Sequence, residues 1–171
     1  YASVTFDQVK VSEANRISTA GQGSNLLNQI LNTACICLSA EMLGMVSEVF
    51  DQTIAYLKER EQFGQAIAGF QAIAFKLADM ATEIEASELL TFQAAYRKNN
   101  KLSVTKEGAF AKYFSSEVAV KCGNEAVQIM GGYGYTREYP AEKFLRDSKL
   151  LTIGEGTSEI QKLVISRDLI K

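Results

Sequence analysis

The chain has 171 residues, of which 47% are apolar and 22% are charged, a balance typical of a globular domain that excludes a disordered chain. Its formal net charge of −2 gives no electrostatic reason to expect nucleic acid or an anionic membrane as a partner. No uninterrupted apolar run reaches the roughly 18 residues that a membrane span needs. We therefore expect no nucleic-acid partner and no membrane span.

Residue types that are absent or rare in the sequence limit the kinds of catalytic and metal site that the chain can form. The sequence has no histidine, which excludes a Cys/His zinc site and a His-based nucleophilic triad, and we expect no metal site. Cys35, Cys37 and Cys122 are odd in number, and we interpret them as buried thiols in a reducing compartment. The single proline, Pro140, predicts long uninterrupted helices and few loops.

The first predicted element is a strand near the N-terminus. In "VTFDQVKV" the β-forming residues Val4, Phe6, Val9 and Val11 roughly alternate with polar ones. No partner strand is predicted further along the chain, and isolated strands are not stable. We expect residues 1–20 to be the last strand and linker of a β-domain that this chain otherwise lacks.

Three long helices are predicted next. A turn at "GQGSN", with Ser24 or Asn25 as N-cap, leads into a helix that ends at Glu59. Two apolar rows predict that this helix is buried on most sides: Leu27, Leu31, Ala34, Leu38, Met42, Met45 and Val49, and Ile30, Cys37, Val46, Phe50, Ile54 and Leu57. The other long helices are predicted over about 70–98 and 103–130.

Two shorter helices complete the prediction. After a loop rich in glycine and tyrosine, a helix is expected from Ala141 to Ser148, and the last helix begins at Ser158, where Gln161 would complete an S-x-x-Q capping box. The sequence therefore predicts an all-α fold over residues 21–171, an up-down bundle of three long helices plus two shorter C-terminal helices.

Several segments contain charged, polar or glycine residues that packing of a helical bundle does not require. Arg60 in "EREQFG" suits either a helix C-terminus or a phosphate group, and Gln71 suits either a cap or a nucleotide contact. "QIMGGYGYT" is either a glycine C-cap or a loop whose bare N–H groups bind a ligand, although no βαβ unit makes it a dinucleotide fingerprint. Glu155 in "IGEGTSEIQ" is either an acidic residue near a helix N-terminus or a catalytic base.

Together these segments resemble the acyl-CoA dehydrogenase family over nearly the whole chain. The resemblance rests on "YLKEREQFGQAIAGFQ", "LADM", "QIMGGYGYTREYP", "FLRDSKL" and "IGEGTSEIQKLVISRDL". It implies that residues 21–171 are the C-terminal helical domain and that residues 1–20 end the middle β-domain. It also implies FAD-dependent oxidation of an acyl-CoA thioester to the trans-2-enoyl-CoA.

The resemblance implies a role for each matching residue. Glu155 would be the base that removes the α-proton, with its N–H as an oxyanion donor, and Gly154 and Gly156 would let the main chain approach the substrate. The implied contacts to FAD are Arg60, Phe63, Gln71, Gln128, Ile129, Met130, Gly131, Gly132, Thr157, Ser158 and Glu159. Of these, Arg60, Gln71 and residues 128–132 would serve the FAD of a neighbouring subunit.

The sequence departs from the family near the substrate. Asn32 and Cys35 stand where many members carry an acidic residue and an arginine, which favours Glu155 over a base at position 32. Gly156, Asn32 and Cys35 are the expected substrate contacts.

The resemblance also implies the assembly and the partners. We expect a homotetramer, a dimer of dimers, with an electron-transfer flavoprotein as electron acceptor, in the bacterial cytoplasm or the mitochondrial matrix. The fragment alone is expected to be inactive. Two alternatives stay open: an acyl-CoA oxidase-like relative, and a non-catalytic helical oligomerisation module.

Overall fold

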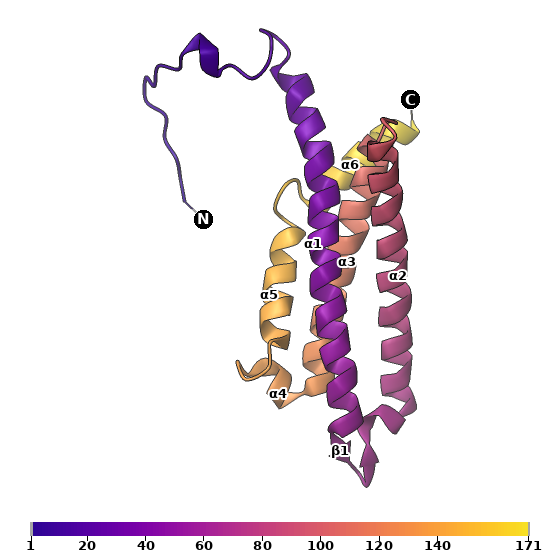
Figure 1. Ribbon diagram of the computed structural model, residues 1–171. Helices are drawn as coiled ribbons and strands as arrows, with labels where there is room; N and C mark the ends of the chain where they lie inside the picture. The colour runs from indigo at the N-terminus through magenta and orange to yellow at the C-terminus, as the bar shows by residue number, and fades with distance from the viewer. Residues whose placement is uncertain (1, 171) are drawn as a thin grey trace.

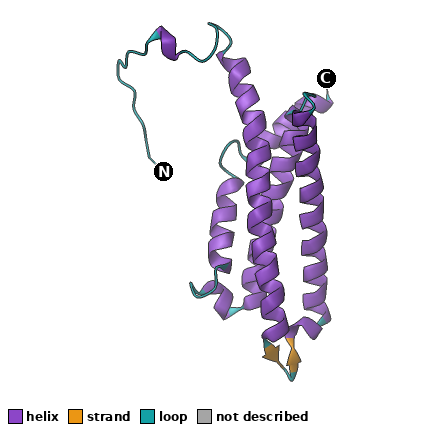
Figure 2. Ribbon diagram, viewed as in Figure 1, coloured by secondary structure: helices purple, strands orange, loops and turns teal. Residues whose placement is uncertain are grey.

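The computed structural model describes residues 2–170, so Tyr1 and Lys171, the outermost residues of the two expected domains, lie outside the described part. Most of the described chain is helical, as expected (Figures 1 and 2). Three long helices and two shorter ones form the bundle: α1 (Gly23–Glu59), α2 (Gln71–Asn99), α3 (Thr105–Met130), α5 (Ala141–Leu151) and α6 (Ser158–Leu169). A one-turn helix, α4 (Gly132–Tyr135), lies within the expected glycine- and tyrosine-rich loop. The predicted all-α bundle is confirmed.

Helix α3 is the centre of the bundle, because it packs against α1, α2, α5 and α6. Small side chains on α3 permit this close packing. At Gly123 a Cβ atom would lie 3.0 Å from the Cα atom of Leu145, so any larger residue would push α5 away. Helix α5 in turn carries the chain to the loop that contains Glu155, so the packing of α3 against α5 positions that loop.

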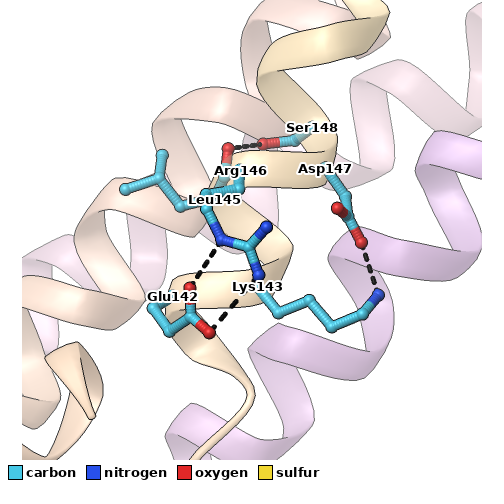
Figure 3. A network of polar contacts seen from close by, with 6 residues as sticks. All are labelled: Glu142, Lys143, Leu145, Arg146, Asp147 and Ser148. Atoms are coloured by element: carbon cyan, nitrogen blue, oxygen red, sulfur yellow. Dashed lines mark hydrogen bonds and ion pairs between the residues drawn. The ribbon is translucent and has the colours of Figure 1, made fainter. Parts of the chain in front are cut away.

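Helix α5 is also stabilised by pairs of side chains along its own surface (Figure 3). Arg146 Nε donates to Glu142 Oε2 at 2.7 Å, and Lys143 pairs with Asp147 one turn along. Both pairs are spaced i, i+4 and exposed to solvent, where such pairs each stabilise a helix by about 0.2–0.5 kcal/mol. They support the helix and leave its other face for α3.

One stripe of α1 is buried against the other helices. It comprises Cys35, Ser39, Met42, Val46, Val49, Thr53 and Leu57, at spacings of three or four residues. Ser39 and Thr53 are tolerated there because their hydroxyl groups donate to the carbonyl oxygens of Cys35 and Val49, at 2.7 and 2.6 Å. The expectation of burial on most sides is wrong for the first part of the helix, where Leu27 is 54% exposed. The N-cap is Gln22, without a side-chain cap bond, in place of Ser24 or Asn25.

The three cysteines do not share one environment. Cys35 and Cys122 are buried, whereas Cys37 is exposed, so the expectation of three buried thiols is wrong for Cys37. The reason is its place on α1, away from the stripe that packs against the other helices. Burial raises the pKa of the Cys122 thiol to about 12, and burial also raises the pKa of Cys35.

Helix α1 is long and apolar enough to cross a membrane by length and composition alone, with a mean hydropathy of 1.5 in its most apolar window. The absence of an uninterrupted apolar run therefore did not exclude such a helix. Core helices of water-soluble proteins meet the same criterion, and α1 packs along α3 in this structure. That the protein has no membrane span stays a prediction.

The expected N-terminal strand is not formed. Residues 2–12 have no regular structure, and the only element before α1 is a 3-10 turn at Glu13–Asn15. Val4, Phe6, Val9 and Val11 are all exposed, and the segment leads away from the bundle (Figure 1). A strand needs a neighbour for its main-chain hydrogen bonds, and the described part of the chain has none beside this segment.

A small hairpin between α1 and α2 was not predicted. Strands β1 (Glu61–Gln62) and β2 (Gln65–Ala66) pair antiparallel. The two residues between them, Phe63 and Gly64, have φ angles of 53° and 81°. Two successive positive φ angles are typical of the tight turns that close two-residue hairpins. The hairpin reverses the chain at the same end of the bundle as α4 (Figure 1).

Candidate active site

Glu155 lies in the loop between α5 and α6, on backbone that is strained for a residue with a side chain. Its φ angle is 55°, and that of Gly156 is 93°. The left-handed φ favours glycine there, and a Cβ atom on Gly156 would lie 2.9 Å from Nε2 of Gln161 and so displace that amide group. Gly154 has no positive φ, and a Cβ atom there would only contact the Leu150 carbonyl oxygen at 3.6 Å. Backbone freedom is therefore needed at Gly156 and not at Gly154.

Two side chains hold the carbonyl oxygen of Gly156. Lys112 Nζ donates to it at 2.7 Å, and Gln161 Nε2 donates to it at 3.3 Å and to the Glu155 carbonyl oxygen at 3.4 Å. Lys112 is entirely buried, and sequence reasoning missed it. The sequence does contain a signal for Lys112. In "GAFAKYFSS" this lysine lies among small residues, on the face of α3 that is buried.

The start of α6 differs from the predicted capping box. Thr157 is the N-cap, and its Oγ1 accepts from the Ile160 N–H at 3.3 Å. The helix begins at Ser158, as predicted, but its N-cap is Thr157, so Gln161 lies one residue too far along to complete a capping box and its side chain instead binds the loop. Ser158 Oγ instead donates to Glu117 Oε1 at 2.5 Å. This contact ties the start of α6 to α3.

A cavity of about 510 Å³ lies beside the Glu155 loop. Four residues expected at the substrate line it together: Glu155, Gly156, Asn32 and Cys35. Its other lining residues are Asn28, Leu31, Thr105, Ile160, Gln161 and Val164. Asn32 Nδ2 donates to Thr105 Oγ1 at 2.9 Å, so its amide is oriented by α3. The cavity has one carboxylate among mainly neutral side chains, which suits an uncharged, largely apolar ligand segment next to a base.

A second cavity, of about 440 Å³, lies at the far end of α1 and gathers Arg60 with Ile129, Met130, Gly131 and Gly132. The Arg60 guanidinium lies over the Tyr133 ring, 5.7 Å from its centroid. None of the ion pairs within residues 2–170 involves Arg60. Added Cβ atoms at Gly131 and Gly132 would meet open space. An unpaired guanidinium beside accessible main chain fits a phosphate-bearing group.

Gly131 has a second, structural role. It ends α3 with a φ of 61°, and its N–H donates to the Gln128 carbonyl oxygen at 3.3 Å. The C-cap interpretation of this loop and the ligand-binding interpretation therefore describe the same glycine and do not compete.

Three residues expected at the cofactor do not line this cavity. Phe63 is 92% exposed at the hairpin tip, where its ring packs edge-on against Phe70 with centroids 6.2 Å apart. Gln71 begins α2 and is exposed, as is Gln128 near the end of α3. The hairpin, the start of α2 and the end of α3 nevertheless lie at one end of the bundle (Figure 1).

The last group, Thr157, Ser158 and Glu159, lines a small cavity of about 130 Å³ on the other side of the Glu155 loop. Glu159 lies in the first turn of α6. Hydrogen bonds to its own main-chain N–H and to Thr157 hold the pKa of its carboxyl group below the usual value. This surface therefore presents N–H groups and hydroxyl groups at a helix start.

The Glu155 cavity and the Arg60 cavity are far apart. Cys35 and Arg60 are both on α1, and at the helical rise per residue they are roughly 38 Å apart along its axis. The two groups of residues therefore belong to separate sites within this chain, one near each end of the bundle.

Comparison with known proteins gives one family. The family described as "Acyl-CoA dehydrogenase, C-terminal domain" matches residues 21–170. A probable acyl-CoA dehydrogenase of Bacillus subtilis, YngJ, is 46% identical over 170 residues, which cover 99% of this chain and 45% of that protein. The CarC subunit of the caffeyl-CoA reductase–Etf complex of Acetobacterium woodii is 42% identical over 170 residues, with the same coverage of 99% and 45%.

A solved structure agrees with these relatives. That of glutaryl-coenzyme A dehydrogenase in complex with glutaryl-CoA matches with a TM-score of 0.92 and 36% identity, covering 96% of this chain and 42% of that one. The chain spans about 45% of the length of the curated relatives named above.

Proposed function

The chain belongs to the acyl-CoA dehydrogenase family, as its C-terminal helical domain, and from this premise we propose that the complete protein oxidises an acyl-CoA thioester to the trans-2-enoyl-CoA. FAD is the cofactor of this family. The observation that carries the proposal is the cavity of about 510 Å³ that is lined by Glu155, an exposed residue on strained backbone, and otherwise by uncharged residues.

Glu155 is the proposed base. A proton next to a thioester carbonyl is too weakly acidic for a carboxylate in water, so the site must stabilise the developing oxyanion and exclude water. Within residues 2–170, no carbonyl oxygen or side chain accepts from the Glu155 N–H, which leaves that N–H free to donate to the thioester oxygen. One residue can then supply both the base and an oxyanion donor. When bound, FAD accepts the hydride from the β-carbon.

The residues of the second cavity are proposed to bind the FAD of a neighbouring subunit. Arg60 would pair with its diphosphate, and Gly131 and Gly132 would let its adenosine end approach the main chain. Two features support this: the cation has no carboxylate partner, and the cavity is far from Glu155. The exposure of Phe63 and Gln71 at the same end suits contacts that another chain completes.

The proposal extends to the whole assembly. Thr157, Ser158 and Glu159 would contact the flavin of their own subunit, and residues 1–20 would join a preceding β-domain that pairs the segment "VTFDQVKV". We propose a homotetramer built as a dimer of dimers. An electron-transfer flavoprotein is the proposed electron acceptor, since the relative from Acetobacterium woodii is named as part of an Etf complex. Bacterial and mitochondrial relatives support a place in the bacterial cytoplasm or the mitochondrial matrix.

The test of this function is Glu155→Gln in the complete protein. The amide keeps the size of the side chain but cannot accept the α-proton, so acyl-CoA should no longer bleach the flavin absorbance under anaerobic conditions, while the FAD content stays normal. Glu88→Gln, an exposed glutamate on α2, is the control and should bleach normally. Bleaching at the normal rate in Glu155→Gln would refute the assignment of the base.

A further inference from the structure

Lys112 is the largest of the fully buried side chains, and it lies beneath the Glu155 loop. Removing an ammonium group from water is costly unless it gains strong partners. Yet none of the ion pairs within residues 2–170 involves Lys112. Its hydrogen bond goes to a main-chain carbonyl oxygen, that of Gly156, at 2.7 Å. The buried ammonium group of Lys112 is thus directed at the Gly156 carbonyl oxygen in the Glu155 loop.

Titratable groups on three elements face Lys112. Burial lowers the pKa of its ammonium group, whereas Cys35 on α1, Glu155 in the loop and Glu117 on α3 act in the opposite direction and raise the pKa. Glu155 and Glu117 are therefore close enough to interact with the ammonium group. Glu117 is engaged with Ser158, so it anchors the start of α6 rather than Lys112.

The carbonyl group that Lys112 holds belongs to the strained part of the loop. Glu155 and Gly156 both have left-handed backbone, which persists only where surrounding contacts impose it. The two bonds from Gln161 are longer, at 3.3 and 3.4 Å, so the bond from Lys112 is the shortest of those that fix this conformation. Gln161 Nε2 donates to the carbonyl oxygens of both Glu155 and Gly156, so the peptide group that Lys112 holds is linked to the one that follows Glu155.

We infer that Lys112 is a positioning residue, whose hydrogen bond to the Gly156 carbonyl oxygen fixes the direction in which Glu155 and its N–H face the cavity. The inference rests on the proposed function, because it assigns Lys112 to the reaction that Glu155 performs. Lys112 acts through the main chain and does not line the cavity.

The experiment compares Lys112→Met, Lys112→Arg and Lys121→Met in the complete FAD-containing protein. Methionine keeps the buried chain length without a donor, and arginine keeps a cationic donor. Lys121, exposed on the same helix and paired with Glu83 at 2.6 Å, is the matched control. We measure amide hydrogen exchange by peptide, FAD content, and kcat and KM for an acyl-CoA.

In Lys112→Met the amides of Ile153, Gly154 and Ser158, whose N–H groups donate to main-chain carbonyl oxygens, should exchange about tenfold faster while those of α3 are unchanged. The value of kcat should fall about tenfold to a hundredfold with little change in KM, since misplacing a catalytic group costs rate rather than binding. Lys112→Arg should keep the amide exchange of the loop and the value of kcat close to those of the parent. Lys121→Met should behave as the parent in both measurements. A purely structural role for Lys112 would instead speed exchange throughout α3 and lower the FAD content.

Parental exchange and kcat in Lys112→Met would overturn the inference. Should that variant not fold, the parent protein decides: if the amides of Ile153, Gly154 and Ser158 exchange at the rate of an unstructured peptide, the loop is not held. The exchange data do not depend on the reaction. If Glu155→Gln kept its activity, the proposed function would fail while the hold of Lys112 on the loop could still be measured.

Discussion

Glu155 and Gly156 combine backbone strain with the candidate chemistry. Both have positive φ angles, and for a residue with a Cβ atom such a conformation costs about 1–2 kcal/mol. Glu155 bears that cost, and the bonds from Lys112 and Gln161 offset it. The loop thus places a carboxylate on backbone that would not adopt this conformation by itself, which is typical of functional sites.

Gly156→Ala should perturb this loop far more than Gly154→Ala. The alanine Cβ at position 156 meets Gln161 Nε2 at 2.9 Å on left-handed backbone. We expect Gly156→Ala to lower the free energy of unfolding by about 1–3 kcal/mol and Gly154→Ala to change it by less than about 1 kcal/mol. Urea unfolding followed by circular dichroism measures both. Equal effects of the two changes would contradict the loop conformation described above.

At the scale of elements, α1 shows how a single helix divides between core and surface. Its apolar residues continue from Leu26 to Leu57, but only positions from Cys35 onward are buried. Met42, Val49 and Leu57 pack in the core, whereas Leu27 and Ile30 are 54% and 50% exposed. Apolar periodicity therefore located the helix correctly but overestimated how much of it this chain buries.

Two leucines of α1 test this division. Leu57 is 0% exposed and Leu27 is 54% exposed. Leu57→Ala should destabilise the chain by about 2–5 kcal/mol, because it removes buried apolar volume and leaves a cavity. Leu27→Ala should change stability by less than about 0.5 kcal/mol. The measurement is the urea midpoint of the 171-residue chain, and a large loss from Leu27→Ala would show that this end of α1 is covered in solution.

At the scale of the whole molecule, the outer face of α2 is unusually apolar. Phe75, Leu89, Phe92 and Tyr96 are 60%, 62%, 63% and 66% exposed, and helical spacing places them on one side, opposite the buried Met80 and Ala94. Contiguous exposed apolar residues mark interaction surfaces. This face is consistent with the proposed assembly of helical domains into a tetramer.

Charges on that face should weaken the assembly. In the complete protein, combining Leu89→Asp with Phe92→Asp would place two carboxylates in a desolvated contact, so the protein should sediment as smaller species than the parent. The control combines Leu89→Met with Phe92→Met, which keeps the surface apolar and should keep the parental state. Sedimentation velocity measures both, and an unchanged state of the aspartate variant would exclude this face from the contact.

The sequence by itself determined the helices and the family. Apolar spacing near 3.6 residues and a single proline predicted the bundle, and the segments around Arg60, Gly131 and Glu155 carried the resemblance because each is a short local pattern. Such patterns report on one element at a time. They could not report that Phe63 and Gly64 close a hairpin, or that Thr157 rather than Ser158 caps the last helix.

Tertiary structure alone decided which side chains meet. Packing of α3 against the loop buries Lys112 and directs it to Gly156, and capping of α6 by Thr157 leaves Gln161 to bind the same carbonyl oxygen. Cys37 stays exposed because it lies outside the stripe of α1 that packs against the other helices. Burial and hydrogen-bond partners depend on residues far away in the chain, and those contacts exist only once the helices have packed together.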